Sequence, residues 1–315
     1  MPAHNSPQAG GGGPRLSVGM EKMIGTLIKA LRVYQWSKNL LVFAALVFAQ
    51  KFLIPDQVLK SLLAFVAFCA ASSAMYLLND VMDIESDRVH PEKRTRPVAS
   101  GALSIRAAIG AMLVLLALSL GISGTLGLPF LLIVCFYLGL TTFYTLELKK
   151  IVIVDVLAVA IGFVVRAIAG AIALDVTFSN WLVVCTLFLA LFLGISKRRH
   201  EIHCLNDDAT SHREVLGHYT VPYLDAINTI VAGAALITYT IYTCSPEVAG
   251  HLGTDKLYLT LPFVVYGLFR YMYLVHHNLD GGDPSSTLIK DRPLAITVIL
   301  WGLACVGLIY WKRMW

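Results

Sequence analysis

Charged residues are scarce in this chain. They make up 14% of its 315 residues, whereas a soluble domain has about 25%. The hydrophobic residues, 57% of the total, come in long blocks, and between Leu103 and Leu146 the only charged side chain is Arg106. A buried helix of a soluble protein needs about 10–14 such residues, but a membrane span needs about 20. The composition excludes a water-soluble protein and predicts an all-α, polytopic membrane protein.

Two further features are missing, namely paired cysteines and a signal peptide. The cysteines lie far apart, mostly inside apolar blocks and without a CxxC pair, which favours small core residues over disulfides or metal ligands. They are Cys69, Cys135, Cys185, Cys204, Cys244 and Cys305. Residues 1–20 are rich in Gly, Pro and Ser, and no apolar segment follows directly, which excludes a signal peptide. We expect residues 1–19 to be a disordered tail and residues 20–315 to form one transmembrane domain.

The apolar blocks predict about nine membrane-spanning helices. We place them at residues 39–55, 57–78, 103–124, 127–146, 152–174, 180–197, 219–244, 257–275 and 293–311. The segment 20–33 precedes the first span, and its apolar side chains share one face of a helix, which suits a helix lying on a membrane surface. These side chains are Met23, Leu27, Ala30 and Leu31.

The basic residues predict the orientation in the membrane. Most of the 25 Lys and Arg residues fall in the N-terminal segment and on the side of the longer connections 79–102, 197–218 and 276–292. By the positive-inside rule this side faces the cytoplasm. We therefore expect a protein of the cell membrane with its N-terminus inside, its C-terminus outside and its polar chemistry on the cytoplasmic side.

The strongest local signal is acidic and closes the second predicted span. Asp80, Asp83 and Asp87 are spaced so that they share one face if the helix continues. Carboxylates stacked in this way repel each other unless a hard cation lies between them, and Mg²⁺ binds through a few carboxylates and phosphate oxygens. A solvated helix end is less favoured, because acids at a helix C-terminus also oppose the macrodipole. We predict a Mg²⁺ site formed by these aspartates.

Basic residues follow the aspartates directly. Arg88, Lys93, Arg94 and Arg96 are explained in part by membrane topology alone. Beside an acidic metal cluster they are also well placed to hold phosphate, Arg with a bidentate fork and Lys as a point charge.

Arg166 lies deep in the fifth predicted span, about 14 residues from its start and hence about 20 Å along a helix. A charge at that depth is costly and usually faces a polar cavity. Asp155 lies on roughly the same face, about three turns earlier. Two interpretations stay open for Arg166: an ion pair with another helix, or a ligand for an anion in a central cavity.

A second polar cluster, SKRRHEIH at residues 196–203, ends the sixth span. Lys197 and Glu201 share a helix face at i, i+4. A zinc-type site at His200 and His203 is disfavoured, because no third ligand is evident.

Residues 79–101 resemble the first aspartate-rich motif of the UbiA superfamily of intramembrane prenyltransferases. The family pattern NDxxDxxxD, followed by a basic stretch and RPxxSG, is matched by Asn79, Asp80, Asp83, Asp87, Arg96, Pro97, Ser100 and Gly101. The resemblance covers nearly the whole chain and implies a nine-helix bundle around a central cavity, with active-site loops after the even-numbered helices. It also implies that Asn79 joins the aspartates as a Mg²⁺ ligand.

Two features resemble one branch of that superfamily, which transfers 5-phosphoribose from phosphoribosyl diphosphate to decaprenyl phosphate. RVYQWSKNLLVF at residues 32–43 is similar to that branch's RPxQWxKNxLV. KRRHE at residues 197–201 stands where users of prenyl diphosphates carry a second aspartate-rich motif, and it is similar to the branch's KRxxE. The stretch 144–155, with Tyr144, Lys149 and Asp155, and RAIAG from Arg166 also fit the branch.

The resemblance implies a reaction and its ligands. The metal cluster would hold the diphosphate of phosphoribosyl diphosphate, and the phosphate of a polyprenyl phosphate would attack the ribose without a general base, because it is already anionic. The substrate-binding residues would be Lys38, Arg94, Arg96, Tyr144, Lys149, Asp155, Arg166, Lys197, Arg198 and Glu201. The product would feed synthesis of an arabinose donor for the cell envelope. No nucleic acid partner is expected, and homo-oligomerisation stays open.

Two other functions compete with this one. The first is transfer of a prenyl group from its diphosphate to an aromatic or lipid acceptor, against which the missing second aspartate-rich motif argues. The second is a transporter or channel, which needs polar residues on both sides of the bilayer, whereas the predicted external loops carry few.

Overall fold

The computed structural model describes residues 24–91, 93–177, 179–205, 214–277 and 284–314. Within these ranges the regular structure is helical, with no strand. The predicted tail, residues 1–19, lies outside the described residues. Five cysteines are free thiols, and their burial differs in part from the prediction of core residues: Cys69 and Cys305 are buried, whereas Cys135 and Cys244 are exposed.

Eight helices are long and apolar enough to cross a membrane. They are α3 (Pro55–Met82), α5 (Ile105–Thr125), α6 (Leu128–Leu146), α7 (Val154–Ala173), α8 (Asn180–Leu205), α10 (Val221–Cys244), α12 (Leu261–His277) and α14 (Arg292–Met314). Together with a shorter apolar helical segment at Val33–Phe48, they confirm the predicted polytopic helical membrane fold.

The bounds predicted for the first span, 39–55, are wrong. The chain instead forms a 3₁₀ helix, η1 (Val33–Phe43), which continues into α2 (Ala44–Phe48). Polar residues at and before the predicted start lie inside η1 because α3 supplies partners for them. The Trp36 indole donates to Ser73 Oγ at 3.0 Å, and the Asn39 amide donates to Ser72 Oγ at 3.1 Å.

Short helices connect the long ones. They are α4 (Ile84–Val89), η2 (Lys93–Thr95), η3 (Leu148–Lys150), η5 (Glu214–His218), α11 (Pro246–Leu252), η6 (Leu257–Thr260) and α13 (Pro284–Lys290). Local signals set several of the long-helix starts. Ser104 and Thr220 cap α5 and α10 by accepting backbone N–H bonds, and proline occupies the first turn of α3, α6 and α10.

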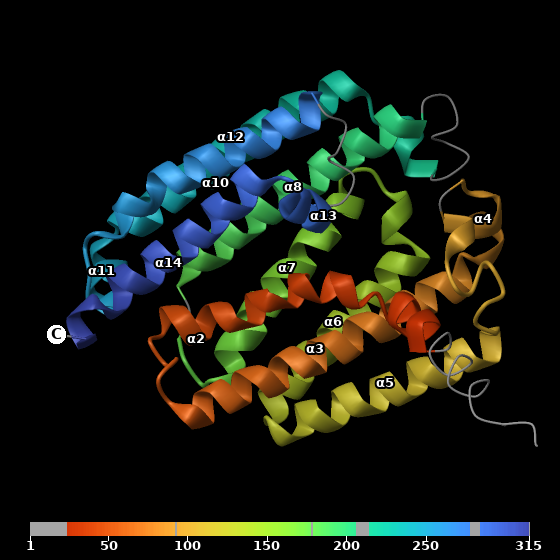
Figure 1. The fold of residues 1–315 in the computed structure, drawn as a ribbon, viewed down its shortest axis with the longest axis horizontal. Helices are drawn as coiled ribbons and strands as arrows, with labels where there is room; N and C mark the ends of the chain where they lie inside the picture. Colours follow the sequence, from red (N-terminus) through yellow and green to blue (C-terminus); the bar gives the residue numbers. More distant parts are fainter. Residues whose placement is uncertain (1–23, 92, 178, 206–213, 278–283, 315) are drawn as a thin grey trace, which may run out of the picture.

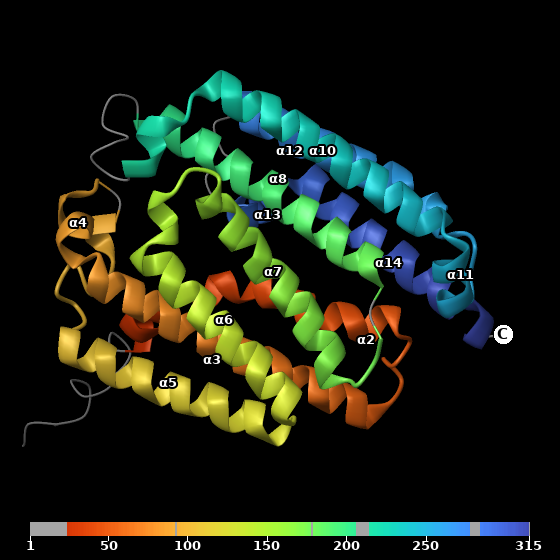
Figure 2. The same ribbon diagram turned by 180° about the vertical axis from the view of Figure 1, so that it is seen from behind.

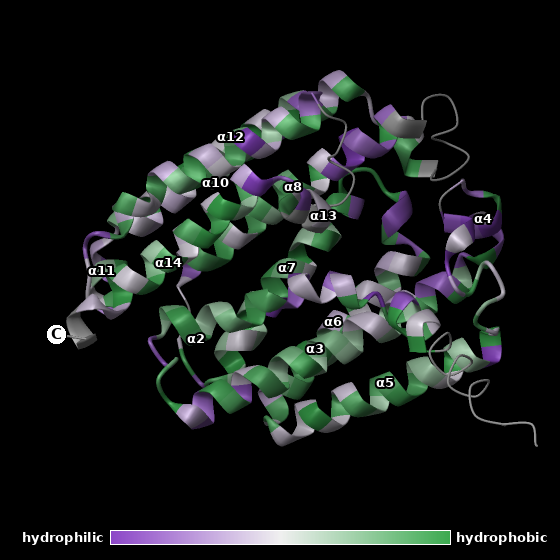
Figure 3. Cartoon of the chain, in the orientation of Figure 1, coloured by the Kyte–Doolittle hydropathy of each residue, from purple (hydrophilic) through white to green (hydrophobic). Residues whose placement is uncertain are grey.

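The long helices form two groups, which Figure 1 shows on the two sides of α7. One group holds η1 with α2, α3, α5 and α6, and the other holds α8, α10, α12 and α14. Both views place the C-terminus at the end of the bundle opposite α4 (Figures 1 and 2). Hydrophilic residues gather at the α4 end, whereas the long helices are mostly apolar between their ends (Figure 3). The polar chemistry is therefore concentrated at the end where α3 meets α4.

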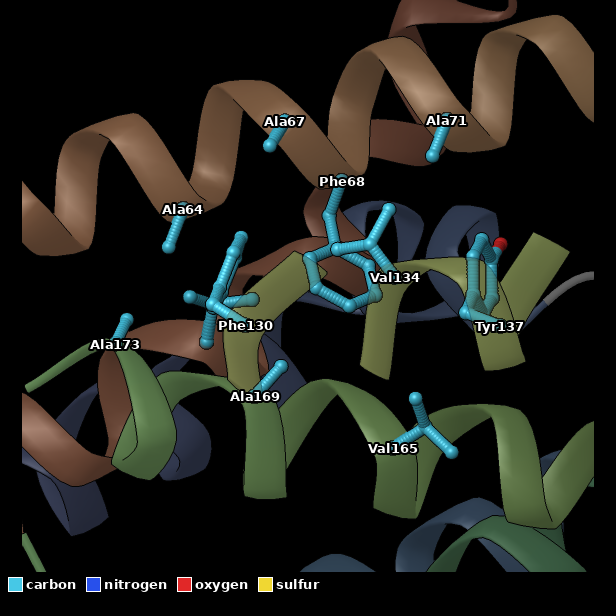
Figure 4. Packing of buried hydrophobic residues seen from close by; sticks show 11 residues of the cluster. Ala64, Ala67, Phe68, Ala71, Phe130, Val134, Tyr137, Val165, Ala169 and Ala173 are labelled. Carbon is cyan, nitrogen blue, oxygen red and sulfur yellow. The ribbon is translucent and has the colours of Figure 1, made fainter. Parts of the chain in front are cut away.

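Small residues bring α3, α6 and α7 close together. In Figure 4 the side chains of Phe130, Val134 and Tyr137 fill the space between α3 and α7. Alanines of α3 and α7 face them, namely Ala64, Ala67, Ala71, Ala169 and Ala173. Small side chains let helix backbones approach within a membrane, where water-driven burial does not hold helices together. This packing places α7 in the middle of the bundle.

Gly170 marks the closest approach of α7 to η1. A Cβ atom built at Gly170 would lie 2.1 Å from the carbonyl oxygen of Val42, so no larger residue fits without moving a backbone. The glycine of the RAIAG stretch therefore has a packing role: it lets α7 contact the backbone of η1 directly.

The segment before η1 is helical over residues 24–31. Its Ala30 is buried and packs with Leu77, Val98 and Ala108, and Leu31 contacts the same cluster. Part of the predicted apolar face thus packs on α3 and α5. Contact of this helix with a membrane surface stays a prediction.

Candidate active site

The acidic segment does not form one continuous helix, and this part of the prediction is wrong. α3 ends at Met82, Asp83 takes a non-helical conformation with ψ of 13°, and α4 begins at Ile84. The aspartates on the two sides of the break and the one at the break differ in their exposure to solvent. Asp80 and Asp87 are both buried, whereas the Asp83 side chain is 27% exposed.

Arg96 joins the two buried aspartates. Its Nη1 lies 2.6 Å from Asp87 Oδ2 and 3.3 Å from Asp80 Oδ1, so one cationic nitrogen bridges the two carboxylates. The stretch after η2 folds back to bring Arg96 there, because the loop packs with Val98 buried against α3 and α5. The fold therefore brings Arg96, a predicted phosphate ligand, to the aspartates, and its contact with a phosphate stays a prediction.

Arg32 is a site residue that the sequence interpretation missed. It pairs with Asp80 Oδ1, and its guanidinium lies 4.8 Å from the centre of the Tyr76 ring. The backbone of Arg32 is left-handed, with φ of 50°, at the start of η1. Its place at the head of the RVYQWSKN stretch was the available signal, but nothing in the local sequence indicated an aspartate as its partner.

Asp83 has a different partner. Lys149 Nζ lies 2.8 Å from Asp83 Oδ1 and comes from η3, the connection between α6 and α7. The two residues are 66 positions apart in sequence. The fold therefore brings Lys149, a predicted substrate ligand, to the rim of the acidic cluster.

The remaining residues predicted around this cluster lie at its edges. Asn79 is partly buried, and its carbonyl oxygen accepts the N–H of Asp83 at 2.9 Å. The Lys38 ammonium donates to Gln35 Oε1, which also accepts from the Tyr76 hydroxyl at 3.4 Å. Arg94 is exposed and makes no ion pair with a described residue, so the structure does not bring it into the cluster.

A second cluster is centred on Arg198 in the C-terminal part of α8, which continues to Leu205 and so past the end predicted at residue 197. Its Nε lies 2.6 Å from Asp155 Oδ2, its Nη1 lies 2.7 Å from Glu201 Oε2, and its Nη2 donates to the Tyr144 hydroxyl at 3.3 Å. Four predicted site residues are thereby brought together. Each of the three guanidinium nitrogens of Arg198 already has an acceptor in the protein, which argues against Arg198 as a direct phosphate ligand.

Tyr219 closes this second cluster and was not predicted. Its hydroxyl donates to Asp155 Oδ1 at 2.7 Å and accepts the N–H of Ile153 at 2.6 Å. Burial raises the pKa of the Tyr219 phenol further above its ordinary value, so the hydroxyl stays a neutral donor. Asp155 is fully buried and bonded on both oxygens, so it acts on Arg198 and Tyr219 and not on Arg166, the residue with which it shares a helix face.

Arg166 is buried among neutral partners. Its Nε donates to Asn39 Oδ1, its Nη1 to the carbonyl oxygen of Gly162 and its Nη2 to the Tyr137 hydroxyl, each at 2.7 Å. The Tyr137 ring centre lies 4.7 Å from the guanidinium. Among the described residues no carboxylate forms an ion pair with Arg166, so the hypothesis of an interhelical ion pair is not supported. Asn39 and Tyr137 are further residues that sequence reasoning did not single out.

The donor atoms at the first cluster fit a magnesium ion in part. Within the described ranges no three acidic, His or Cys side chains converge as a ready-made metal site. Asp80 and Asp87 do converge, because the Arg96 guanidinium stands between them as a cation. Mg²⁺ commonly binds through one or two carboxylates and completes its shell with water and substrate phosphates.

Comparison with known proteins gives the family. Residues 39–290 match the UbiA prenyltransferase family, and the chain belongs to it. The decaprenyl-phosphate phosphoribosyltransferase of Mycolicibacterium smegmatis is 33% identical over 292 residues, covering 89% of this chain and 91% of that protein. The protein of the same name from Corynebacterium glutamicum is 34% identical over 289 residues, covering 90% of this chain and 86% of its own.

A solved structure supports the fold. A UbiA homologue from Archaeoglobus fulgidus bound to GPP and Mg²⁺ has a TM-score of 0.67 and 18% identity, over 90% of this chain and 99% of that one. The family and fold predicted from sequence are confirmed: this is a multi-pass membrane protein of a transferase family.

Proposed function

We propose that this chain transfers 5-phosphoribose from phosphoribosyl diphosphate to a polyprenyl phosphate, with Mg²⁺ as cofactor, at the cytoplasmic face of the cell membrane. The full-length similarity to decaprenyl-phosphate phosphoribosyltransferases supports the reaction. The structural observation that carries it is a contrast in side chains: three aspartates lie where α3 meets α4, whereas the C-terminal part of α8 carries Lys197 and Arg198, with Glu201 paired to Arg198. The site therefore offers one acidic cluster to a metal-bound diphosphate, and not two.

The first cluster is the proposed place of the diphosphate. Asp80 and Asp87 would hold Mg²⁺, with Asn79 and Asp83 beside them, and the ion would stabilise the departing diphosphate. Arg32, Arg96 and Lys149 lie against these carboxylates and are positioned to contact phosphate oxygens. Arginine and lysine bind phosphate strongly in sites that exclude water.

The other two phosphate groups, namely the 5-phosphate of the donor and the phosphate of the lipid, need cations as well. The candidates are Lys38 of η1 and Lys197 in the C-terminal part of α8. Arg198 and Arg166 have positioning roles in this proposal. Arg198 orients Tyr144 and Glu201, whereas Arg166 holds η1, and with it Lys38, through Asn39.

The reaction needs no protein base. The lipid phosphate oxygen forms a bond to C1 of the ribose while the bond from C1 to the diphosphate oxygen breaks, and the diphosphate leaves with the electron pair. The polyprenyl phosphate is already an anion, so no proton has to be removed from the nucleophile. Its hydrocarbon tail would lie along the apolar faces of the membrane helices.

The deciding experiment tests the purified protein with two alternative donor substrates in separate reactions. Radiolabelled phosphoribosyl diphosphate with decaprenyl phosphate and Mg²⁺ should give a labelled lipid and free diphosphate, and the Asp80→Asn variant should form them far more slowly. A parallel reaction contains a labelled prenyl diphosphate with aromatic and lipid acceptors. Prenyl transfer without any phosphoribosyl transfer would overturn the proposal and favour the competing prenyltransferase function.

A further inference from the structure

Every aspartate of the acidic cluster is paired with a cation from another part of the chain. Asp80 pairs with Arg32, which precedes η1, and Asp83 pairs with Lys149 of η3. Asp87 pairs with Arg96, which also contacts Asp80. Three carboxylates thus face three cations from three separate segments.

These are the groups to which the proposed function assigns opposite tasks, carboxylates to the metal and cations to the phosphates. In this structure they bind each other instead. We propose that a metal ion and a diphosphate must bind here together, by exchanging partners with these ion pairs. The metal ion takes the place of the cations beside the carboxylates. The diphosphate takes the place of the carboxylates beside the cations. This inference rests on the proposed metal–diphosphate site.

Burial is the physical reason for the coupling. Asp80 is 1% exposed and Asp87 is 2% exposed, so each carboxylate needs a positive partner while it is ionised. A metal ion that binds alone has to displace the Arg96 guanidinium from between two carboxylates. The displaced cation then lies beside another cation without a partner of its own.

A diphosphate that binds alone meets the reverse obstacle. It has to draw Arg32, Arg96 and Lys149 away from their aspartates and leave buried carboxylates facing an anion. When both ligands enter, every displaced group gains a new partner of opposite charge. Each ligand therefore raises the affinity for the other, by the same factor in both directions.

The test measures two affinities by titration calorimetry in detergent: that of Mn²⁺ alone, and that of the preformed complex of Mg²⁺ with inorganic diphosphate. In Arg96→Gln the carboxylates lose the cation that competes with the metal. We expect the affinity for Mn²⁺ alone to rise by about tenfold, since the charge-assisted contact that competes with the metal is gone. The affinity for the complex should change much less, because the substitution removes one contact of Arg96 from the free state and one from the bound state.

Two further variants make the result decisive. Arg88→Gln removes a nearby positive charge that pairs with exposed Glu85, so it should change the affinity for Mn²⁺ alone much less than Arg96→Gln. Lys149→Gln frees Asp83 of its cation at a more exposed position and should likewise raise the affinity for Mn²⁺ alone more than that for the complex if Arg96→Gln does not fold. A loss or no change of Mn²⁺ affinity in folded Arg96→Gln, or in Lys149→Gln if that variant alone folds, would overturn the exchange. The titrations contain no ribosyl or prenyl group, so they do not depend on which donor the enzyme uses.

Discussion

Arg166 donates its Nε–H to Asn39 Oδ1 at 2.7 Å, which joins the middle of α7 to η1. One turn further along α7, Gly170 lies against the carbonyl oxygen of Val42. Two stretches that are far apart in sequence, RAIAG and QWSKN, are therefore one packing unit. Because Lys38 precedes Asn39 in η1, this unit also fixes the backbone position from which the Lys38 side chain extends.

Arg166→Met should destabilise the protein and reduce its activity. The change leaves Asn39 Oδ1 and the Tyr137 hydroxyl without their donor inside the bundle, at a cost of about 1–3 kcal/mol each. Thermal melting in detergent and kcat/KM for phosphoribosyl diphosphate measure the two effects. Arg106→Met, at an exposed position of α5, is the control and should melt like the wild type. Unchanged melting with lost substrate affinity would instead make Arg166 an anion ligand.

Gly170→Ala should lower the free energy of unfolding by about 1–3 kcal/mol, because the new methyl group overlaps the backbone of η1. Gly139→Ala is the matched control, since nothing lies within 4 Å of its new Cβ. Alanine is the better helix former, so this variant should be as stable as the wild type or more stable by up to about 1 kcal/mol. Equal melting temperatures for the two variants would contradict direct contact between α7 and η1.

Asp80→Asn and Asp87→Asn should each lower kcat/KM on the order of a hundredfold or more, because each removes a charge aimed at the proposed metal. Raising the Mg²⁺ concentration should not restore the rate. Glu85→Gln removes an exposed acid from the same segment and should act like the wild type. Near-normal activity in either aspartate variant, over a full Mg²⁺ titration, would refute their assignment as metal ligands.

Tyr219→Phe should raise the KM for substrate more than it changes kcat. The variant lacks the hydroxyl that donates to Asp155 and accepts the Ile153 N–H, and Asp155 in turn orients Arg198. The loss of these bonds should cost about 1–3 kcal/mol of binding free energy. Tyr223 stacks on Tyr219 with ring centres 6.3 Å apart and makes no bond to Asp155, so Tyr223→Phe is the control. The same kinetic constants in both variants would show that the hydroxyl of Tyr219 has no positioning role.

Most of the membrane helices were predictable from sequence within a few residues. The span expected at 103–124 is α5 (Ile105–Thr125), and that expected at 127–146 is α6 (Leu128–Leu146). A long apolar run is a local property, and in lipid it has to form a helix that satisfies its own backbone. The first span was misplaced because its polar residues, such as Trp36 and Asn39, have partners on a distant helix.

The composition of the candidate site was largely predictable, but its pairing was not. Sequence spacing predicted that Asp80, Asp83 and Asp87 would share a helix face. In the structure the helix breaks at Asp83, and the Asp83 carboxylate pairs with Lys149. Arg198 was expected to grip phosphate, and instead it holds Asp155 and Glu201. A single sequence contains no distance between residues that lie dozens of positions apart, so these partners could not be derived.

The sequence by itself determined the environment of this protein and the chemistry available to it. Long runs without charge require helices in a membrane, and one acidic motif beside basic residues indicates a metal and phosphates. The tertiary structure alone decided which charges neutralise each other: Arg32 and Arg96 at Asp80, Arg198 at Asp155, and neutral partners for Arg166. Burial is the physical reason, because a charge removed from water must take whichever partner the packing of the helices brings within reach.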